Sequence, residues 1–191
     1  MSDWLQTFTG TAPGKLLSKR LGIPSPPILR RYEPGQALLE APALVGGAPG
    51  GRLHKAAADV MVAAGAEVKA RQAEGARYGA VVYDASGIKK VADLSRLHAF
   101  LAPAFKAIGP SGRLIVLGTP PEAARNPEEA AAQKALDGFV RSAAKEARFG
   151  TTCNLIYVGA GAEAAFESTL RFFASARSAY VDGQPVRVNP A

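Results

Sequence analysis

Apolar residues alternate along the chain between short continuous runs and stretches in which they recur three and four positions apart. The continuous runs are typical of strands buried on both faces, and the spaced stretches indicate helices with one apolar face. The predicted strands are 43–47, 67–69, 79–84, 113–118, 152–158 and 185–188. The predicted helices are 52–64, 91–108, 127–148 and 163–175. Pro103 should kink or restart the second helix, because proline lacks the N–H that the helix needs.

Alternating strands and helices imply parallel strands, joined by right-handed crossovers, with helices on both faces of the sheet. We therefore expect a three-layer α/β domain at 43–191 with a mostly parallel sheet of about five or six strands. Residues 1–42 have a different pattern, with a short helix at 16–22 followed by a proline-rich extended segment. We expect them to form an N-terminal helix and arm, and we expect residues 13–34 to dock on the domain.

Composition narrows the class of protein. The 191 residues are 48% hydrophobic and 20% charged, no apolar stretch is long enough to cross a membrane, and Cys153 is the single cysteine. These features favour a cytoplasmic protein that does not contact a membrane. The net charge is +7, but the basic residues are scattered and not interleaved with aromatic residues. We therefore expect no nucleic acid partner, and the basic surface is either solvated or a docking face for an acidic protein. His54 and His98 have no partners at metal-ligand spacing, so no metal site is predicted.

The C-terminal third carries a motif order that resembles the second half of the short-chain dehydrogenase/reductase family. The segments are 112–119, 133–142, 152–159 and 178–188. That family places a serine after the first of these strands, and a tyrosine four residues before a helix lysine. Tyrosine donates the proton in ketone reduction, and lysine lowers the pKa of the tyrosine and binds the cofactor ribose. Here Thr119 stands at the serine position, Lys134 at the lysine position and Ala130 at the tyrosine position. Ala130 has no proton to give, so we expect no intact catalytic residue, only these vestigial positions.

The cofactor-binding loop departs from the family in the same way. A dinucleotide site needs glycines for the tight turn, for the close approach of the pyrophosphate and for the contact between helix and strand. Gly46, Gly47 and Gly51 follow the first strand, but Leu53 occupies the last glycine position. Asp84 opens a segment similar to the one that borders adenosine in the family. We treat these glycines and Asp84 as a vestigial nucleotide site, and we expect no cofactor to bind this chain.

The likeness extends to nearly the whole chain when it is compared with the high-molecular-weight 3-oxoacyl-acyl-carrier-protein reductases. It rests on segments 13–24, 29–32, 84–88, 118–124 and 175–184. Those bacterial proteins join a flavodoxin-like, degenerate reductase domain to a complete ketoreductase domain that uses NADH or NADPH. The resemblance implies a Rossmann- or flavodoxin-like first domain, taken as a fragment that ends before the linker.

The implied function is a non-catalytic structural and assembly domain of a fatty-acid synthesis reductase, with the active site in a C-terminal domain. That C-terminal ketoreductase domain is then a partner, a homodimer is expected, and acyl carrier protein is a further candidate partner. Two alternatives stay open. The chain is a free-standing NAD(P)H-dependent ketoreductase with an atypical proton donor, or it is a module that docks acyl carrier protein.

Overall fold

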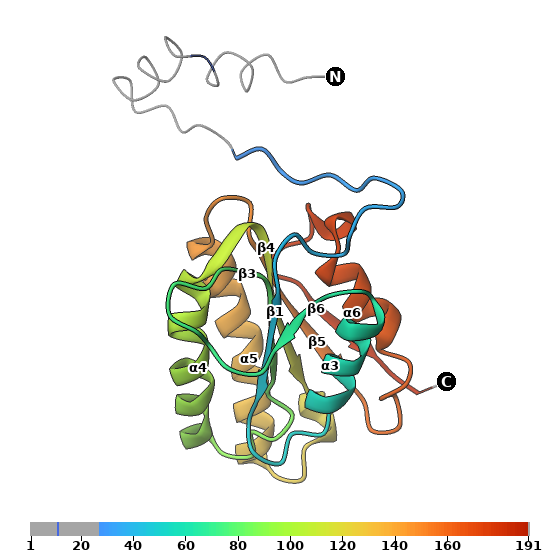
Figure 1. The fold of residues 1–191 in the computed structure, drawn as a ribbon. Helices are drawn as coiled ribbons and strands as arrows, with labels where there is room; N and C mark the ends of the chain where they lie inside the picture. Colours follow the sequence, from blue (N-terminus) through green and yellow to red (C-terminus); the bar gives the residue numbers. More distant parts are fainter. Residues whose placement is uncertain (1–10, 12–26, 191) are drawn as a thin grey trace.

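The fold is built on a sheet of six parallel strands, as Figure 1 shows. This structure is a computed structural model that describes Thr11 and residues 27–190, so the helix expected at 16–22 lies outside the described residues. The strand order is β2-β1-β3-β4-β5-β6, and every neighbouring pair is parallel. In chain order the strands are β1 (Ala43–Gly47), β2 (Val68–Lys69), β3 (Tyr78–Asp84), β4 (Ile108–Gly118), β5 (Thr152–Val158) and β6 (Pro185–Val188).

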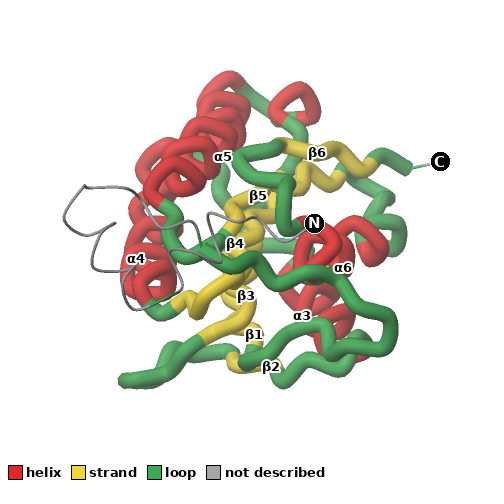
Figure 2. The backbone as a smooth tube through the Cα atoms, turned by 90° about the horizontal axis from the view of Figure 1, so that it is seen from above, coloured by secondary structure: helices red, strands yellow, loops and turns green. Residues whose placement is uncertain are grey.

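Helices cover both faces of the sheet, as seen from above in Figure 2. Helices α4 (Leu94–Lys106) and α5 (Pro127–Glu146) lie on one face, and α3 (His54–Ala63) and α6 (Glu167–Ala174) lie on the other. Three short 3-10 turns stand at Val91–Asp93, Pro121–Ala123 and Ala176–Ser178. None of the helices within residues 27–190 has the length and hydrophobicity needed to cross a membrane. The three-layer α/β expectation is therefore confirmed, with all strands parallel.

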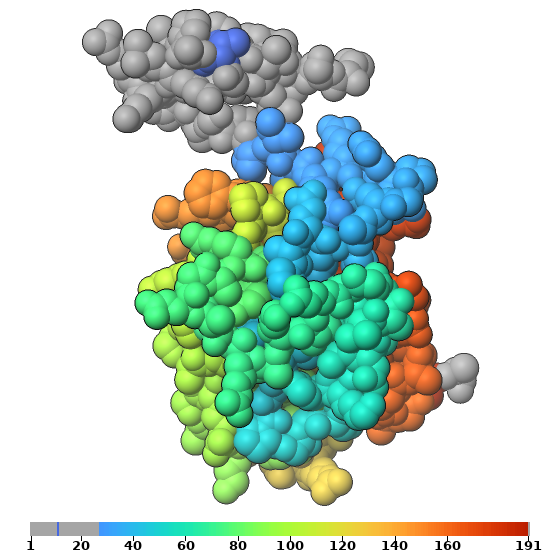
Figure 3. All heavy atoms as spheres, in the orientation of Figure 1, coloured from blue at the N-terminus to red at the C-terminus, as the bar shows by residue number. Residues whose placement is uncertain are grey.

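Residues 27–42 lie over the amino-terminal edge of the sheet, at the top of Figure 3. The Leu29 side chain packs on Gly150, where it leaves no room for a Cβ. The Arg30 backbone N–H donates a hydrogen bond of 3.1 Å to Ser111 Oγ. Leu38 and Leu39 pack against the core beneath α3 and α6. This described part of the arm contacts the domain, and residues 13–26 of the expected docking segment lie outside the described residues.

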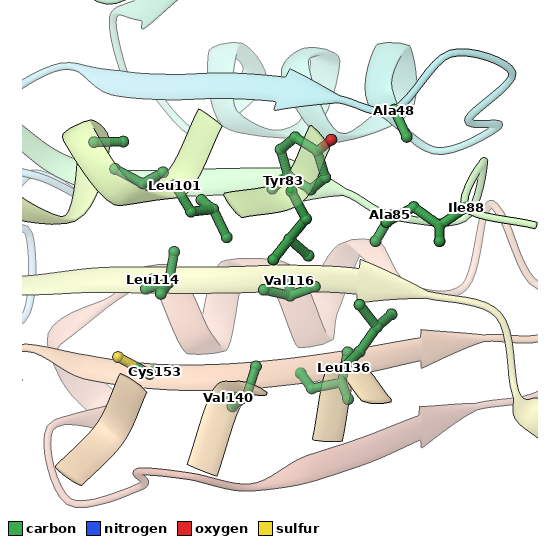
Figure 4. Packing of buried hydrophobic residues seen from close by; sticks show 14 of the residues in the cluster. Ala48, Tyr83, Ala85, Ile88, Leu101, Leu114, Val116, Leu136, Val140 and Cys153 are labelled. Atoms are coloured by element: carbon green, nitrogen blue, oxygen red, sulfur yellow. The ribbon is translucent and has the colours of Figure 1, made fainter. Parts of the chain in front are cut away.

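Side chains on successive strand residues alternate between two cores, because they point to opposite faces of the sheet. On β4, Leu114 and Val116 face α4 and α5, whereas Ile115 and Leu117 face α3 and α6. Figure 4 shows part of the first core, in which Leu101, Leu136 and Val140 from the two helices meet residues of β3, β4 and β5. Burial on both faces explains why these strands have continuous apolar runs.

Several elements differ from the predicted bounds. Strand β4 begins at Ile108 rather than at 113. Helix α4 continues through Pro103 without restarting, and this residue is exposed in the last turns of a helix whose other face is held by Leu97 and Leu101. Helix α6 is shorter than the predicted 163–175 and begins only at Glu167. Residues 70–77 join β2 to β3 without a helix. The connection between these two strands, which lie on either side of β1, therefore has no strand–helix unit.

We predict that the contacts of residues 27–34 contribute measurably to stability. Truncation of residues 1–34 should lower the free energy of unfolding by about 1–3 kcal/mol relative to truncation of residues 1–26. This range combines the partial burial of Leu29 with one hydrogen bond to Ser111. Urea denaturation of the two truncated proteins measures the difference. Equal stability of the two would mean that this part of the arm does not support the domain.

Candidate functional site at the carboxyl edge of the sheet

Parallel strands bring their carboxyl ends to one edge of the sheet, at the bottom of Figure 1. Strand β1 pairs with two strands of the sheet. Strand β2, the next one along the chain, lies on one side of β1, and β3 lies on the other. The strand order therefore reverses between β1 and β3, and open α/β sheets bind ligands at such a position. At this point Gly47 of β1 is in register with Asp84 of β3. The glycine turn and the Asp84 segment thus lie side by side.

The Asp84 carboxylate is fully buried and accepts hydrogen bonds from backbone N–H groups. Its Oδ2 accepts from Leu53 N at 2.7 Å and from His54 N at 2.8 Å, and its Oδ1 accepts from Ser86 N at 2.9 Å. Ser86 Oγ in turn accepts from Arg52 N at 2.9 Å. Three consecutive N–H groups at the start of α3 are therefore already bound to side chains from the loop after β3.

These contacts decide whether a dinucleotide fits here. In dinucleotide-binding folds the pyrophosphate takes the N–H groups at this helix start and benefits from the helix dipole. A Cβ on Gly51 would lie only 2.4 Å from Asp84 Oδ2, and one on Gly87 would lie 2.4 Å from Pro49 O. The two loops are thus in direct contact, and a carboxylate occupies the anion position. A pyrophosphate would meet a negative charge and bound donors, so the residues present do not fit it.

The glycines of the turn serve close packing instead. A Cβ on Gly46 would lie 2.3 Å from the Phe100 ring, and one on Gly47 would lie 3.0 Å from Asp84 Cβ. Leu53, at the last glycine position of the family motif, is fully buried in the core beneath α3 and α6. The Arg52 side chain crosses the edge to Glu163 and to the carbonyl of Val158 at the end of β5. The Gly46 contact brings α4 close to the sheet, and the contacts of Gly47, Leu53 and Arg52 hold the start of α3 against it.

A second buried group, the Gln133 amide of α5, joins the segments that follow β3 and β4. Its Nε2 donates to Ala85 O at 2.9 Å and to Ile88 O at 2.8 Å, and its Oε1 accepts from Thr119 N at 2.8 Å. The Tyr157 hydroxyl donates to the backbone carbonyl of Gln133 at 2.9 Å. Gln133 therefore uses both donors of its amide and its acceptor within the protein.

One turn earlier, Glu129 faces the same edge. Only 3% of Glu129 is exposed, and its carboxylate forms an ion pair of 2.6 Å with the Lys89 ammonium. The hydrogen bond from Lys89 lowers the pKa of Glu129 below its ordinary value, with a further contribution from the Arg125 backbone N–H. Asn126 caps the helix by accepting the Glu129 N–H at 2.9 Å. Glu129 is therefore held ionised and paired.

The three residues that the sequence placed at the catalytic positions have different surroundings. Thr119 is half-buried, and its backbone N–H is bound to Gln133. Ala130 is half-buried, one position after Glu129. The Lys134 side chain is 68% exposed, and its ammonium pairs with Asp137 at 2.8 Å. In contrast, Gly47, Gly51 and Asp84 do come together at the carboxyl edge.

The residues of α5 that face the sheet edge are therefore Glu129 and Gln133, one position before Ala130 and Lys134. Sequence reasoning missed both because the lysine suggested the motif alignment. The helical period did contain a signal for the inward face. Positions on one face of a helix recur every three or four residues, as do 129, 133, 136 and 140. Leu136 and Val140 are core residues, so Glu129 and Gln133 share their inward face.

The two buried tyrosines at this edge, Tyr157 and Tyr83, both have raised pKa values. Burial raises the pKa of Tyr157 to about 12, and the nearby Asp137 charge adds to the shift. Burial also raises the pKa of Tyr83, again with help from a carboxylate, that of Asp84. A raised pKa makes each hydroxyl a weaker acid than free tyrosine. No group of three or more metal-ligating side chains gathers among residues 27–190.

The comparisons with known proteins agree with the fold. No family model matches the sequence, and no curated protein matches it. Two variants of a Serratia marcescens short-chain dehydrogenase/reductase superpose with TM-scores of 0.63 and 0.62 at 16% and 18% sequence identity. Each alignment covers 81% of this chain and 98% of the other. The reductase LugOII, which catalyses keto-reduction at C1 in lugdunomycin biosynthesis, superposes with a TM-score of 0.61 at 16% identity over 79% of this chain and 96% of its own. The chain thus has the Rossmann-like fold of short-chain dehydrogenase/reductases.

We predict that Gln133, and not Lys134, supports the fold. Gln133→Leu leaves Thr119 N and two carbonyls without their partner in a buried position, and should lower the free energy of unfolding by about 2–4 kcal/mol. Lys134→Leu removes one exposed ion pair and should change it by less than about 1 kcal/mol. Urea denaturation of both variants gives the comparison. A larger loss in the Lys134 variant would contradict the assignment of the inward face.

Proposed function

We propose that this chain is a non-catalytic structural and assembly domain with the fold of the short-chain dehydrogenase/reductases. The whole protein is proposed to be a 3-oxoacyl-acyl-carrier-protein reductase of fatty-acid synthesis, with its active site and its NADH or NADPH in a C-terminal ketoreductase domain. The single observation that favours the non-catalytic role is the Asp84 carboxylate at the start of α3. It takes the backbone donors that a cofactor pyrophosphate would need.

The arrangement of α5 supports the same proposal. A reductase of this fold needs a proton donor beside the substrate carbonyl and a cation beside the cofactor ribose. On the inward face of α5 these places are taken by Glu129, which is paired with Lys89, and by the neutral amide of Gln133. A free-standing ketoreductase with an atypical donor is the enzyme alternative. It has less support, because Tyr157 donates its hydroxyl proton to a carbonyl and has a raised pKa.

The assembly role is proposed for the outer face of α4 and α5. A groove of about 250 Å³ runs between the two helices and is lined by apolar groups that include Leu101, Phe105, Phe139 and Ala143. The partner proposed for it is the C-terminal domain of the same polypeptide or a second copy of this chain. Docking of acyl carrier protein on the basic surface is the remaining alternative, and that association would weaken with added salt.

The chain alone is predicted to show no ketoreductase activity. Purified protein with an acetoacetyl thioester and NADH or NADPH should oxidise cofactor no faster than the uncatalysed mixture. Ala130→Tyr should remain inactive, because Lys134 is paired with Asp137 in solvent rather than directed to the sheet edge. Absorbance at the reduced nicotinamide band reports the rate. Turnover by the natural sequence, or recovery of activity in Ala130→Tyr, would refute the non-catalytic proposal.

A charge placed in the α4–α5 groove should disrupt assembly. Ala143→Glu puts a carboxylate on the half-buried lining of the groove, and it should shift a self-associated protein towards monomer without lowering its helix content. Sedimentation velocity measures the species, and circular dichroism checks the fold. Ala135→Glu, which makes the same change at an exposed position of the same helix outside the groove, is the matched control. If the natural sequence is already monomeric and Ala143→Glu leaves its sedimentation unchanged, self-association through the groove is refuted. The C-terminal domain is then the partner to be tested in the whole protein.

A further inference from the structure

The amino-terminal edge of the sheet, opposite the candidate site, contains a cavity of about 510 Å³. It lies between the end of α4, the start of β4 and the turn after α5. In Figure 3 the start of β4 and this turn lie side by side beneath residues 27–42. The volume falls within the range of about 300–1,000 Å³ that is usual for small-molecule sites.

The lining of this cavity combines apolar surface with an excess of positive charge. Phe105, Ile108, Pro110 and Phe149 supply the apolar part, and 69% of Phe149 is exposed. The charged lining residues are Arg77, Lys106, Arg148 and Glu146. Within residues 27–190 none of these four belongs to an ion pair, so three cations face one carboxylate without being neutralised. Such a lining favours an anion that carries an apolar group.

The backbone beside the cavity is strained. Ser111 and Phe149 have φ values of 53° and 55°, and they are the non-glycine residues with positive φ in the described part of the chain. The two are joined, because Ser111 N donates to Phe149 O at 2.8 Å. Side chains make this region of φ unfavourable, and residues held there concentrate at ligand sites. The exposed Phe149 side chain borders the cavity.

A buried guanidinium lies behind this surface. Only 2% of Arg113 is exposed, and it donates to the carbonyls of Ser111 at 2.8 Å and Gly112 at 3.1 Å. No carboxylate of residues 27–190 lies within ion-pair distance of it. It lines a second cavity of about 210 Å³ that shares Arg77, Gly109 and Pro110 with the first. Burial is the main reason that the pKa of Arg113 falls to about 10; the Arg30 charge acts in the same direction, and the Asp182 charge opposes both. A buried cation without a carboxylate at ion-pair distance is costly, and a bound anion nearby would offset that cost.

We propose that the cavity at the amino-terminal edge binds a small amphiphilic anion. Its phosphate or carboxylate group would lie among Arg77, Lys106 and Arg148, and its apolar part would lie on Phe105, Ile108 and Phe149. Cations near helix C-termini also interact with the helix dipole, as Lys106 does at the end of α4. Interaction with the helix dipole is thus another reason for a cation at this place. It does not explain why the cations surround an open apolar cavity. The proposal is independent of the non-catalytic role.

Isothermal titration calorimetry with octyl phosphate, below its micelle-forming concentration, tests the proposal on the full chain. Inorganic phosphate supplies the head group alone, and octanol supplies the apolar group alone. We expect octyl phosphate to bind saturably at one site. Inorganic phosphate and octanol should each bind with an affinity lower by at least about tenfold. Added salt should weaken the binding, because the cations are exposed.

Two double variants separate this site from a general effect of charge. Arg77→Gln with Arg148→Gln removes two exposed cations at the cavity and should weaken octyl phosphate binding by about tenfold or more. Lys55→Gln with Arg171→Gln removes the same charge from α3 and α6, and should leave the affinity within about twofold. Circular dichroism verifies that both variants are folded. Absence of saturable binding, equal binding of octanol, or equal weakening in the two variants would each overturn the proposal.

Discussion

The buried carboxylate of Asp84 is the interaction on which the carboxyl edge of this domain depends. An ionised carboxylate without partners is very unfavourable in an apolar interior. Here three backbone N–H groups bind it, and two of them belong to the start of α3, where the helix dipole also favours negative charge. The loops after β1 and β3 must therefore stay closed on each other. With the two loops in contact, the backbone N–H groups at the start of α3 bind Asp84, whereas in nucleotide-binding proteins of this fold they bind the pyrophosphate.

Gln133 extends the closure across the rest of the edge. A single amide connects the loop after β3, the end of β4 and helix α5, and its hydrogen-bonding capacity is used within the protein. Polar networks that are fully satisfied make a buried region rigid, because any movement exposes unpaired groups. Glu129 with Lys89 completes the arrangement one turn earlier.

The sequence predicted the elements better than it predicted the site. Strands β1, β5 and β6 have the predicted bounds, because glycine or proline residues stand at or next to the ends of each. The motif positions stay a prediction, because a lysine in a helix indicates a family alignment but not the direction of its side chain. A shift of one residue turns a helix by about 100°, which takes Lys134 from the sheet edge to solvent and puts Gln133 in its place. Asp84 was assigned to the nucleotide site, and its contact with α3 could not be derived without the distance between two loops that are far apart in sequence.

The two edges of the sheet therefore have opposite electrostatic states. At the carboxyl edge, where parallel α/β sheets usually bind their ligands, the buried carboxylates of Asp84 and Glu129 each have a partner. At the amino edge, Arg77, Lys106, Arg148 and the buried Arg113 have no carboxylate within ion-pair distance among residues 27–190. Unneutralised charge beside an apolar cavity favours an anion, whereas a network whose groups are all paired offers a ligand no free donor. The anion site that we propose therefore lies at the edge opposite to the one at which open α/β sheets usually bind their ligands.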